Sequence, residues 1–276
     1  MIRDKVAVLL ATYNGARYIK RQLDSLCQQS YSDFSIYVHD DGSSDDTINI
    51  ILNYDDDRIH IMTDSKSSRG AKKNFIWLLE HVEADYYMFC DQDDWWLPFK
   101  IEQSLDFIKK IERDDPRRPV CIHTDLAVAD ENYNVISQSL WKQSRIKPSF
   151  LENKTYIQIF NCVTGCTMMF NNRAKECAFP FNENAPMHDF WVPYQTMVHD
   201  GILTHLPVST MLYCQHGNNT VGANDVGANY VRNKFIHLSR VYKDNIINYK
   251  NMHAISGISI LNYIKCKLIY ELYRFF

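Results

Sequence analysis

Short apolar runs alternate with longer amphipathic runs through the first half of the chain. Five short runs are mostly apolar and predict strands: Val6–Leu10, Phe34–His39, Ile59–Met62, Tyr86–Cys90 and Val120–His123. Four runs between them carry apolar residues at helical spacing: Ala16–Gln29, Thr47–Tyr54, Lys72–His81 and Pro98–Glu112. Because strands that are apolar throughout are buried on both faces, the pattern predicts an α/β fold with a mostly parallel central sheet flanked by helices.

Polar residues follow three of these strands at the point where each strand ends. Ala11–Gly15 reads Ala-Thr-Tyr-Asn-Gly, Asp40–Thr47 reads Asp-Asp-Gly-Ser-Ser-Asp-Asp-Thr, and Asp91–Asp94 reads Asp-Gln-Asp-Asp. In sheets of this kind, ligands bind outside the carboxyl ends of the strands. The sequence therefore predicts a binding site at this edge of the sheet.

The second half of the chain is less regular. Asp130–Asn134 predicts a hairpin turn, Thr167–Phe170 a strand and Asp189–His199 a short helix. From Tyr230 onward, two helical segments follow with a break at Ser256-Gly257. With no internal repeat and no flexible linker, we expect one main domain over residues 1–228 and a helical C-terminal extension over residues 229–276.

Charge is divided unevenly along the chain. The segment from Arg232 to the C-terminus holds eight Lys or Arg and two acidic residues, which gives it a charge of +6. The whole chain has a net charge of −3, so the first 231 residues carry −9. A basic tail with apolar residues at helical spacing is suited to a membrane interface with anionic lipids. The same pattern is equally compatible with a tail that packs on the rest of the protein, contacts a second copy of the chain or forms a solvated helical face.

Several classes of protein are excluded or disfavoured. The mild net charge argues against a general nucleic-acid binder. The eight cysteines form no CxxC pair, and the first residues, Met1–Leu10, lack the features of a signal peptide. No apolar stretch is long enough to span a membrane. We therefore expect a cytoplasmic protein with reduced thiols. If its tail contacts a membrane, the protein would lie peripherally on the cytoplasmic face of the inner membrane.

Two acidic loops are candidates for chemistry. Asp91 and Asp93 are spaced so that both carboxylates can converge on one hard cation, and Mg²⁺ or Mn²⁺ is favoured if that cation also holds a diphosphate. An acidic loop that caps the helix beginning near Pro98 is the alternative. The Asp40–Thr47 loop lacks the spacing of a calcium loop and predicts a tight glycine turn.

Taken in order, the three loops resemble those of family-2 glycosyltransferases with the GT-A fold. The resemblance covers roughly residues 5–220 and is closest to the bacterial rhamnosyltransferase-like branch, where Asp-Gln-Asp-Asp is followed by an aromatic residue, here Trp95. It implies a GT-A nucleotide-diphospho-sugar transferase fold.

The resemblance also implies a donor site. Thr12 and Tyr13 would contact the base or ribose, Asp41 would accept from the pyrimidine N3–H, and Asn74, with Lys73, would lie near the nucleotide or its phosphates. Asp93 would bind Mn²⁺ or Mg²⁺ directly, while Asp91 would reach the ribose or the metal through water. Asp94 would support the loop or the sugar, and His216 would complete the metal site.

An acceptor side is implied as well. Asn161–Cys166 resembles the glycine-containing acceptor loop, with Gly165 at the hallmark position, although a plain turn explains that glycine equally well. In Met187–Trp191, Asp189 would be the general base and His188 would replace the acid that usually precedes it. Trp191 would offer a platform to a sugar face, or belong to the core.

These assignments imply an inverting glycosyltransferase that uses a nucleotide-diphosphate sugar, with dTDP-rhamnose as one candidate donor. The acceptor would be a glycan, which is often lipid-linked in this family. O-antigen or capsule synthesis is the implied setting, and a homodimer is compatible with the sequence. A nucleotidyltransferase is disfavoured because the first loop is neither glycine-rich nor basic. An inactive nucleotide-sugar-binding scaffold has no support, and a zinc site at Cys214, His216, His199 and His205 lacks paired-ligand spacing.

Overall fold

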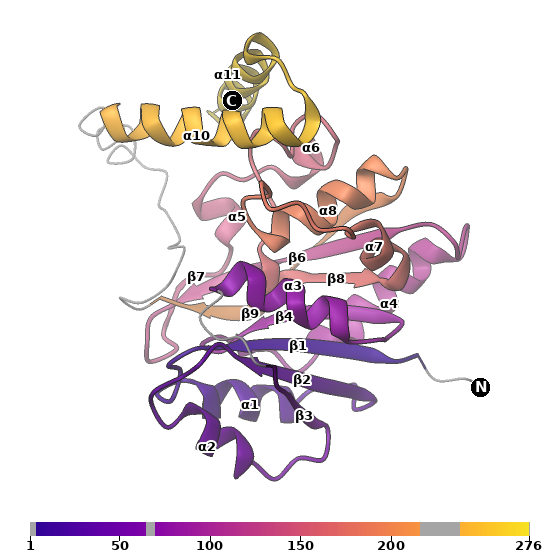
Figure 1. The fold of residues 1–276 in the computed structure, drawn as a ribbon, viewed down its shortest axis with the longest axis vertical. Coiled ribbons are helices and arrows are strands. Elements are labelled where there is room, and N and C mark those ends of the chain that lie inside the picture. The colour runs from indigo at the N-terminus through magenta and orange to yellow at the C-terminus, as the bar shows by residue number, and fades with distance from the viewer. Residues whose placement is uncertain (1–3, 65–69, 216–237, 276) are drawn as a thin grey trace.

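A computed structural model describes residues 4–64, 70–215 and 238–275 (Figure 1). One nine-stranded sheet forms the centre of the molecule, with the order β3-β2-β1-β4-β8-β6-β9-β5, and with β7 paired to β6. The strands are β1 Val6–Thr12, β2 Phe34–Asp40, β3 Ile59–Met62, β4 Tyr86–Asp91, β5 Trp95–Trp96, β6 Val120–Ala129, β7 Val135–Ser137, β8 Met168–Asn171 and β9 Ile202–Cys214.

The helices lie in the connections between strands and at the C-terminal end. They are α1 Ile19–Cys27, α2 Thr47–Leu52, α3 Ala71–His81, α4 Lys100–Glu112, α5 Leu140–Gln143, α6 Pro148–Leu151, α7 Asn172–Cys177, α8 His188–Val198, α10 Leu238–Ser256 and α11 Ile260–Phe275, with a 3₁₀ turn η1 at Gly165–Thr167. Within the described residues, no helix is long and apolar enough to cross a membrane.

The predicted α/β class is confirmed, and the direction of the strands changes partway across the sheet. Strands β3, β2, β1 and β4 are parallel, as predicted. Strand β8 then runs antiparallel to both β4 and β6, so the whole sheet is mixed. The predicted strand at Val120–His123 continues to Ala129 because β6 pairs along most of the long strand β9, which the sequence did not predict.

Both faces of the sheet are buried. Along β1, Val6, Val8 and Leu10 belong to one core and Ala7 and Leu9 to the other, as the two-residue period of a strand requires. The first core is covered by α1 and α4, and the second by α3, α7 and α8. The continuous apolar runs of the parallel strands follow from this double burial.

The two C-terminal helices lie over the same core as α8 (Figure 1). They match the two predicted segments, and the break between them falls at Gly257, whose φ of 72° suits a residue without a side chain. Met252 from α10 and Tyr263, Cys266 and Tyr270 from α11 are buried in this core. The predicted domain boundary at residue 228 lies outside the described residues.

Candidate active site

A cavity of about 880 Å³ opens at the carboxyl ends of the parallel strands. Strand register explains why three distant loops meet there, because Thr12 pairs with Asp40 on one side and Ala11 with Asp91 on the other. The cavity runs from these loops past the start of α8 to the segment 140–163 and to helices α10 and α11. Its size lies within the range of small-molecule sites.

Hydrogen bonds lock the first loop to its two neighbours. The Thr12 hydroxyl donates to Asp40 Oδ1 at 2.7 Å. The Gln92 side chain accepts from Tyr13 N at 2.9 Å and donates to Tyr13 O at 3.0 Å. A Cβ on Gly15 would lie 2.1 Å from Gln92 Oε1, so a larger residue would have to displace the Gln92 side chain from its hydrogen bonds to Tyr13. Asp40 and Gln92 therefore hold the loops together, a role that the sequence did not reveal.

The residues predicted to bind the nucleotide all line this end of the cavity: Thr12, Tyr13, Asp41, Asn74 and Asp91. Tyr13 is 54% exposed, so its ring is free to cover a ligand. Asp41 is buried and accepts from Gly70 N at 2.7 Å. Asn74 shares a 2.7 Å hydrogen bond with His39 Nδ1 and donates to His39 O, so its amide is already engaged. Lys73 pairs with Glu183 at 3.6 Å and is not among the lining residues.

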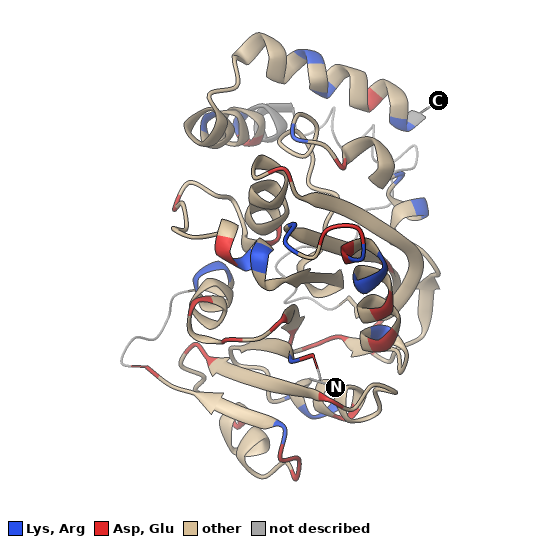
Figure 2. Cartoon of the chain, turned by 90° about the vertical axis from the view of Figure 1, so that its right-hand side faces the viewer, with Lys and Arg blue, Asp and Glu red and all other residues tan. Residues whose placement is uncertain are grey.

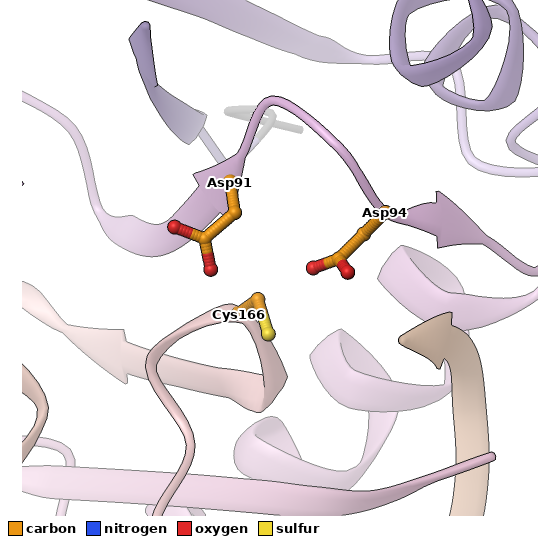
Figure 3. Close-up of side chains that lie close together, drawn as sticks. All are labelled: Asp91, Asp94 and Cys166. Carbon is orange, nitrogen blue, oxygen red and sulfur yellow. The ribbon is translucent and has the colours of Figure 1, made fainter. Parts of the chain in front are cut away.

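Asp91, Asp94 and the Cys166 thiol converge behind the loop that follows β4 (Figure 3). One ligand atom from each lies within 4.8 Å of the others. Asp94 is fully buried, and within the described residues neither of its oxygens has a well-aligned hydrogen-bond partner, although the Cys166 thiol and the Cys214 backbone interact with its carboxylate. A carboxylate buried in this way is unfavourable unless a proton or a cation joins it, and the carboxylates of Asp91 and Asp94, rather than the thiol, suit a hard divalent cation.

The pKa values of this cluster reflect burial and mutual repulsion. Desolvation, and then the charges of Asp93 and Asp189, raise the pKa of Asp91 above its usual range. Desolvation, and then the charges of Asp93 and Asp91, raise the pKa of Asp94. Burial also raises the pKa of the Cys166 thiol, which therefore stays protonated. A bound cation would reverse these shifts, since it favours the charged carboxylates.

Asp93 lines the cavity but does not belong to the group formed by Asp91, Asp94 and Cys166. The sequence analysis placed Asp94 in a supporting role and missed Cys166, which the 3₁₀ turn η1 brings to this point. It also missed the buried cation Lys100, whose Nζ donates to Thr210 at 3.1 Å and lies 4.7 Å from the Trp96 ring. Desolvation lowers the pKa of Lys100 to about 8.

Asp189 lies in the first turn of α8 and lines the cavity. Asn161 Nδ2 donates to its Oδ1 at 3.1 Å. Desolvation raises the pKa of Asp189 to about 7, while hydrogen bonds from the backbone of Gly165 and Phe190 oppose the shift. A carboxyl group with a pKa near neutrality is suited to exchange a proton during a reaction.

His188, the neighbour of Asp189, is a neutral imidazole. Its ring packs 4.3 Å from the ring of Phe75 and 4.7 Å from that of Phe89, between ring centroids. Burial lowers its pKa to about 3, and neither ring nitrogen has a hydrogen-bond partner among the residues that the structure describes. Because His188 lines the cavity, it can exchange a hydrogen bond with a ligand hydroxyl there without carrying charge.

Gly165 touches both of these residues. A Cβ at this position would lie 2.7 Å from His188 Nε2 and 3.4 Å from Asp189 Cβ. The glycine is therefore required by close approach, in addition to the turn that it starts.

We predict that Gly165→Ala lowers turnover roughly tenfold or more, because the methyl group must displace an imidazole that two aromatic rings hold in place. Initial rates with the natural acceptor check this. Gly257→Ala is the matched control, since it strains a positive φ with no atom within 4 Å of the new Cβ. Equal rates for the two variants would contradict the prediction.

Two predicted site residues need separate comment. Trp191 is 4% exposed, its Nε1 donates to Ala178 O at 2.7 Å, and it is not among the cavity-lining residues, which agrees with the core alternative to a sugar platform. Two residues along a helix turn by about 200°, which places Trp191 opposite Asp189. His216 lies outside the described residues. Of the other zinc candidates, His205 instead contacts Glu152 at 2.7 Å.

Comparison with known proteins shows what the chain is similar to. Residues 7–176 match the Glycosyl transferase family 2 profile. The chain is 32% identical over 236 residues to a dTDP-rhamnosyl transferase, RfbG, from Shigella flexneri, covering 78% of this chain and 74% of that protein. It is 25% identical over 181 residues to UDP-Glc:alpha-D-GlcNAc-diphosphoundecaprenol beta-1,3-glucosyltransferase WfgD from Escherichia coli, covering 64% of each. It spans only 38–49% of several longer Rickettsia relatives.

The fold also occurs in solved structures. The mannosyltransferase PcManGT from Pyrobaculum calidifontis, in complex with GDP-Man and Mn²⁺, aligns with a TM-score of 0.58 and 16% identity, over 98% of this chain and 74% of that one. The architecture described above is therefore the GT-A fold.

Proposed function

Because the chain belongs to glycosyltransferase family 2, we propose that it transfers a sugar, with inversion, from a nucleotide-diphosphate donor to a hydroxyl group of a glycan acceptor. One observation carries the proposal. Asp189 lines the same cavity as Asp91 and Asp93 of the loop after β4 and as the largely apolar segment before η1. The arrangement has room for a donor and an acceptor on opposite sides of one carboxylate.

The donor would occupy the end formed by the loops after β1, β2 and β4. There Thr12, Tyr13 and Asp41 would hold the base and ribose, with Asn74 orienting the wall beside them. Mn²⁺ or Mg²⁺ would be held by Asp93 and Asp91, with Asp94, whose carboxylate lies close to that of Asp91, as a supporting carboxylate and His216 as a further ligand. When bound, such an ion neutralises the departing diphosphate as a Lewis acid.

The acceptor hydroxyl would approach Asp189 from the opposite end. The Asp189 carboxylate accepts the hydroxyl proton as the acceptor oxygen bonds to the anomeric carbon and the bond to the diphosphate oxygen breaks. Attack from the face opposite the leaving group inverts the anomeric centre. His188 and Gly165 would shape the space for the sugar, since both border Asp189.

L-Rhamnose from dTDP-rhamnose is the proposed donor sugar, and bacterial surface polysaccharide is the proposed product. The Shigella flexneri relative, a dTDP-rhamnosyl transferase, supports the first assignment. The Escherichia coli relative, whose name gives a diphosphoundecaprenol-linked acceptor, supports a lipid-linked acceptor. A β-linked dTDP-rhamnose donor would then give an α-linked product.

The proposal is tested by incubating the protein with dTDP-rhamnose, UDP-glucose and GDP-mannose, each with Mn²⁺, Mg²⁺ or EDTA, and a lipid-linked glycan extract. We expect release of one nucleoside diphosphate, only with metal, together with a product whose anomeric configuration by NMR is opposite to that of the donor. A retained configuration, or no release from any donor, would overturn it.

We also propose that α11 contacts the cytoplasmic face of the inner membrane. Its inward face is buried at Tyr263, Cys266, Tyr270 and Arg274. The opposite face exposes apolar side chains, namely Ile260, Leu261, Ile264, Leu268 and Leu272. Figure 2 shows more basic than acidic residues on this helix, which complements anionic lipid headgroups.

We predict that the protein sediments with phosphatidylglycerol vesicles, and that Leu268→Asn reduces the bound fraction several-fold because it removes apolar surface from the bilayer. Ile136→Asn is the control, since Ile136 is a similarly exposed residue on β7. A bound fraction equal in both variants would contradict membrane contact. A Leu268-dependent dimer in light scattering would assign the face to a second copy instead.

A further inference from the structure

The segment before the 3₁₀ turn η1 brings the amide side chain of Asn161 to the wall of the cavity. Its Oδ1 accepts from Val163 N at 3.0 Å, and its Nδ2 donates to Val163 O at 2.9 Å and to Asp189 Oδ1 at 3.1 Å. Because a backbone N–H only donates and a backbone carbonyl only accepts, Val163 fixes which end of the amide carries the NH₂ group. This NH₂ group is therefore directed at the Asp189 carboxylate.

The Asp189 carboxylate lies where its charged form is disfavoured. Burial raises its pKa to about 7, and Asp91, from the end of β4, is a second acid whose charge interacts with it. His188 from α8 supplies no positive charge, since burial lowers its pKa to about 3, and burial raises the pKa of the Cys162 thiol, which stays neutral. The ionised form is favoured by hydrogen bonds from the backbone and from the Asn161 side chain. Asn161 therefore opposes the effect of burial.

We propose that Asn161 is the positioning residue of the general base, which orients the Asp189 carboxylate in the cavity and stabilises its ionised form. A hydrogen bond to a carboxylate is stronger than one to a neutral carboxyl group, so the contact favours the state that accepts the proton of the acceptor hydroxyl. The inference deepens the proposed function and rests on it. It also ties the base to the part of the cavity wall formed by residues 157–164.

A double-mutant cycle tests the contact without any substrate. Thermal unfolding at pH 5 and at pH 9 compares the intact protein, Asn161→Ala, Asp189→Asn and the double variant. At pH 9, where Asp189 is ionised, we expect Asn161→Ala to lower the unfolding temperature by roughly 2 °C or more beyond its effect in Asp189→Asn. At pH 5, where Asp189 is protonated, Asn161→Ala should have the same effect in both backgrounds. Asp91 is present in all four proteins, so its own titration cancels.

An equal effect of Asn161→Ala in both backgrounds at pH 9 would mean that Asn161 acts on the backbone alone, and would overturn the proposal. Asn153→Ala is the matched control from the same segment. Asn153 Oδ1 accepts from Thr155 N and Tyr156 N, each at 3.0 Å, and its Nδ2 donates to Phe150 O at 3.0 Å, but Asn153 does not line the cavity. Its substitution should show no pH-dependent coupling to position 189.

The pH profile of turnover gives a second readout that a purely structural role would not move. We expect Asn161→Ala to shift the midpoint of kcat upward by about half a pH unit or more, while donor affinity stays within a few-fold of the intact protein. Asn161→Asp keeps the size of the side chain but replaces the NH₂ donor with an acid, and should shift the midpoint further upward. A lower kcat with an unmoved midpoint in both variants would overturn the proposal.

The two readouts distinguish failure of this inference from failure of the proposed function. If Asp189→Asn retains full turnover, the proposed base is wrong, whatever the cycle shows. If Asp189→Asn is inactive and the cycle shows no coupling at pH 9, the proposed base stands and the role of Asn161 is overturned.

Discussion

Asp189→Asn is expected to lower turnover about 100- to 10,000-fold, the usual contribution of a general base. The amide keeps the size of the side chain and its contact with Asn161, but it cannot accept the acceptor proton. Steady-state rates with the identified donor check the change. Donor affinity should stay within a few-fold of the intact protein, because Asp189 lies beyond the nucleotide loops.

The pKa of Asp189 gives this prediction a pH dependence. Because the pKa is raised to about 7, the carboxylate is present above pH 7, and kcat should fall as the pH decreases below that value. The raised pKa also means that the folded state binds this proton more tightly than the unfolded state, so stability due to Asp189 declines from about pH 4 to pH 7. Asp189→Asn should therefore raise the unfolding temperature more at pH 8 than at pH 4.

A matched control separates the loss of the base from a general effect of removing charge. Asp57→Asn changes an exposed aspartate before β3, away from the cavity, and should retain full turnover. If Asp189→Asn retained more than about a tenth of the activity, the assignment of the base would be wrong.

Asp93→Asn is expected to reduce turnover at least about 100-fold and to weaken Mn²⁺ binding, because it removes a carboxylate ligand. Titration calorimetry with Mn²⁺ in the presence of the nucleoside diphosphate measures the binding directly. Metal affinity should also rise from pH 6 to pH 8, since the raised pKa of Asp91 makes a proton compete with the metal. Equal Mn²⁺ affinity in Asp93→Asn and in the intact protein would contradict the proposed ligand set.

The parallel half of the fold could be predicted because its signals are local. The strand at Ile59–Met62 has the predicted limits, and α3 begins one residue before its predicted start. Strand β9 could not be predicted in this way. It is partly exposed along its length, contains Pro207 and shifts register against β6, so neither a two-residue alternation nor a continuous apolar run marks it.

The part of the candidate site at the strand ends could be predicted because the sequence locates the ends of these strands well. Thr12, Asp41 and Asp91 meet there through the parallel register of β1, β2 and β4. Contacts that depend on long-range topology could not be predicted. Cys166 reaches the acidic loop only because β8 lies between β4 and β6, and Arg274 reaches the cavity only because α11 packs on the second core.

Trp191 shows a different limit of sequence reasoning. Aromatic residues serve both as sugar platforms and as core residues, and the choice depends on which face of the helix meets the cavity. In α8 that face carries Asp189, so Trp191 packs next to Phe181 instead, with ring centroids 5.8 Å apart.

We propose that the cavity at the sheet edge is a metal-dependent nucleotide-sugar site. Calorimetric titration of the intact protein with a panel of nucleotide sugars, with and without Mn²⁺, tests it most directly, with Asp93→Asn and Asp57→Asn measured in parallel. We expect one nucleotide sugar to bind with Mn²⁺, to bind far more weakly without it, and to lose the metal effect in Asp93→Asn alone. Absence of binding by every nucleotide sugar, with or without metal, would contradict the claim.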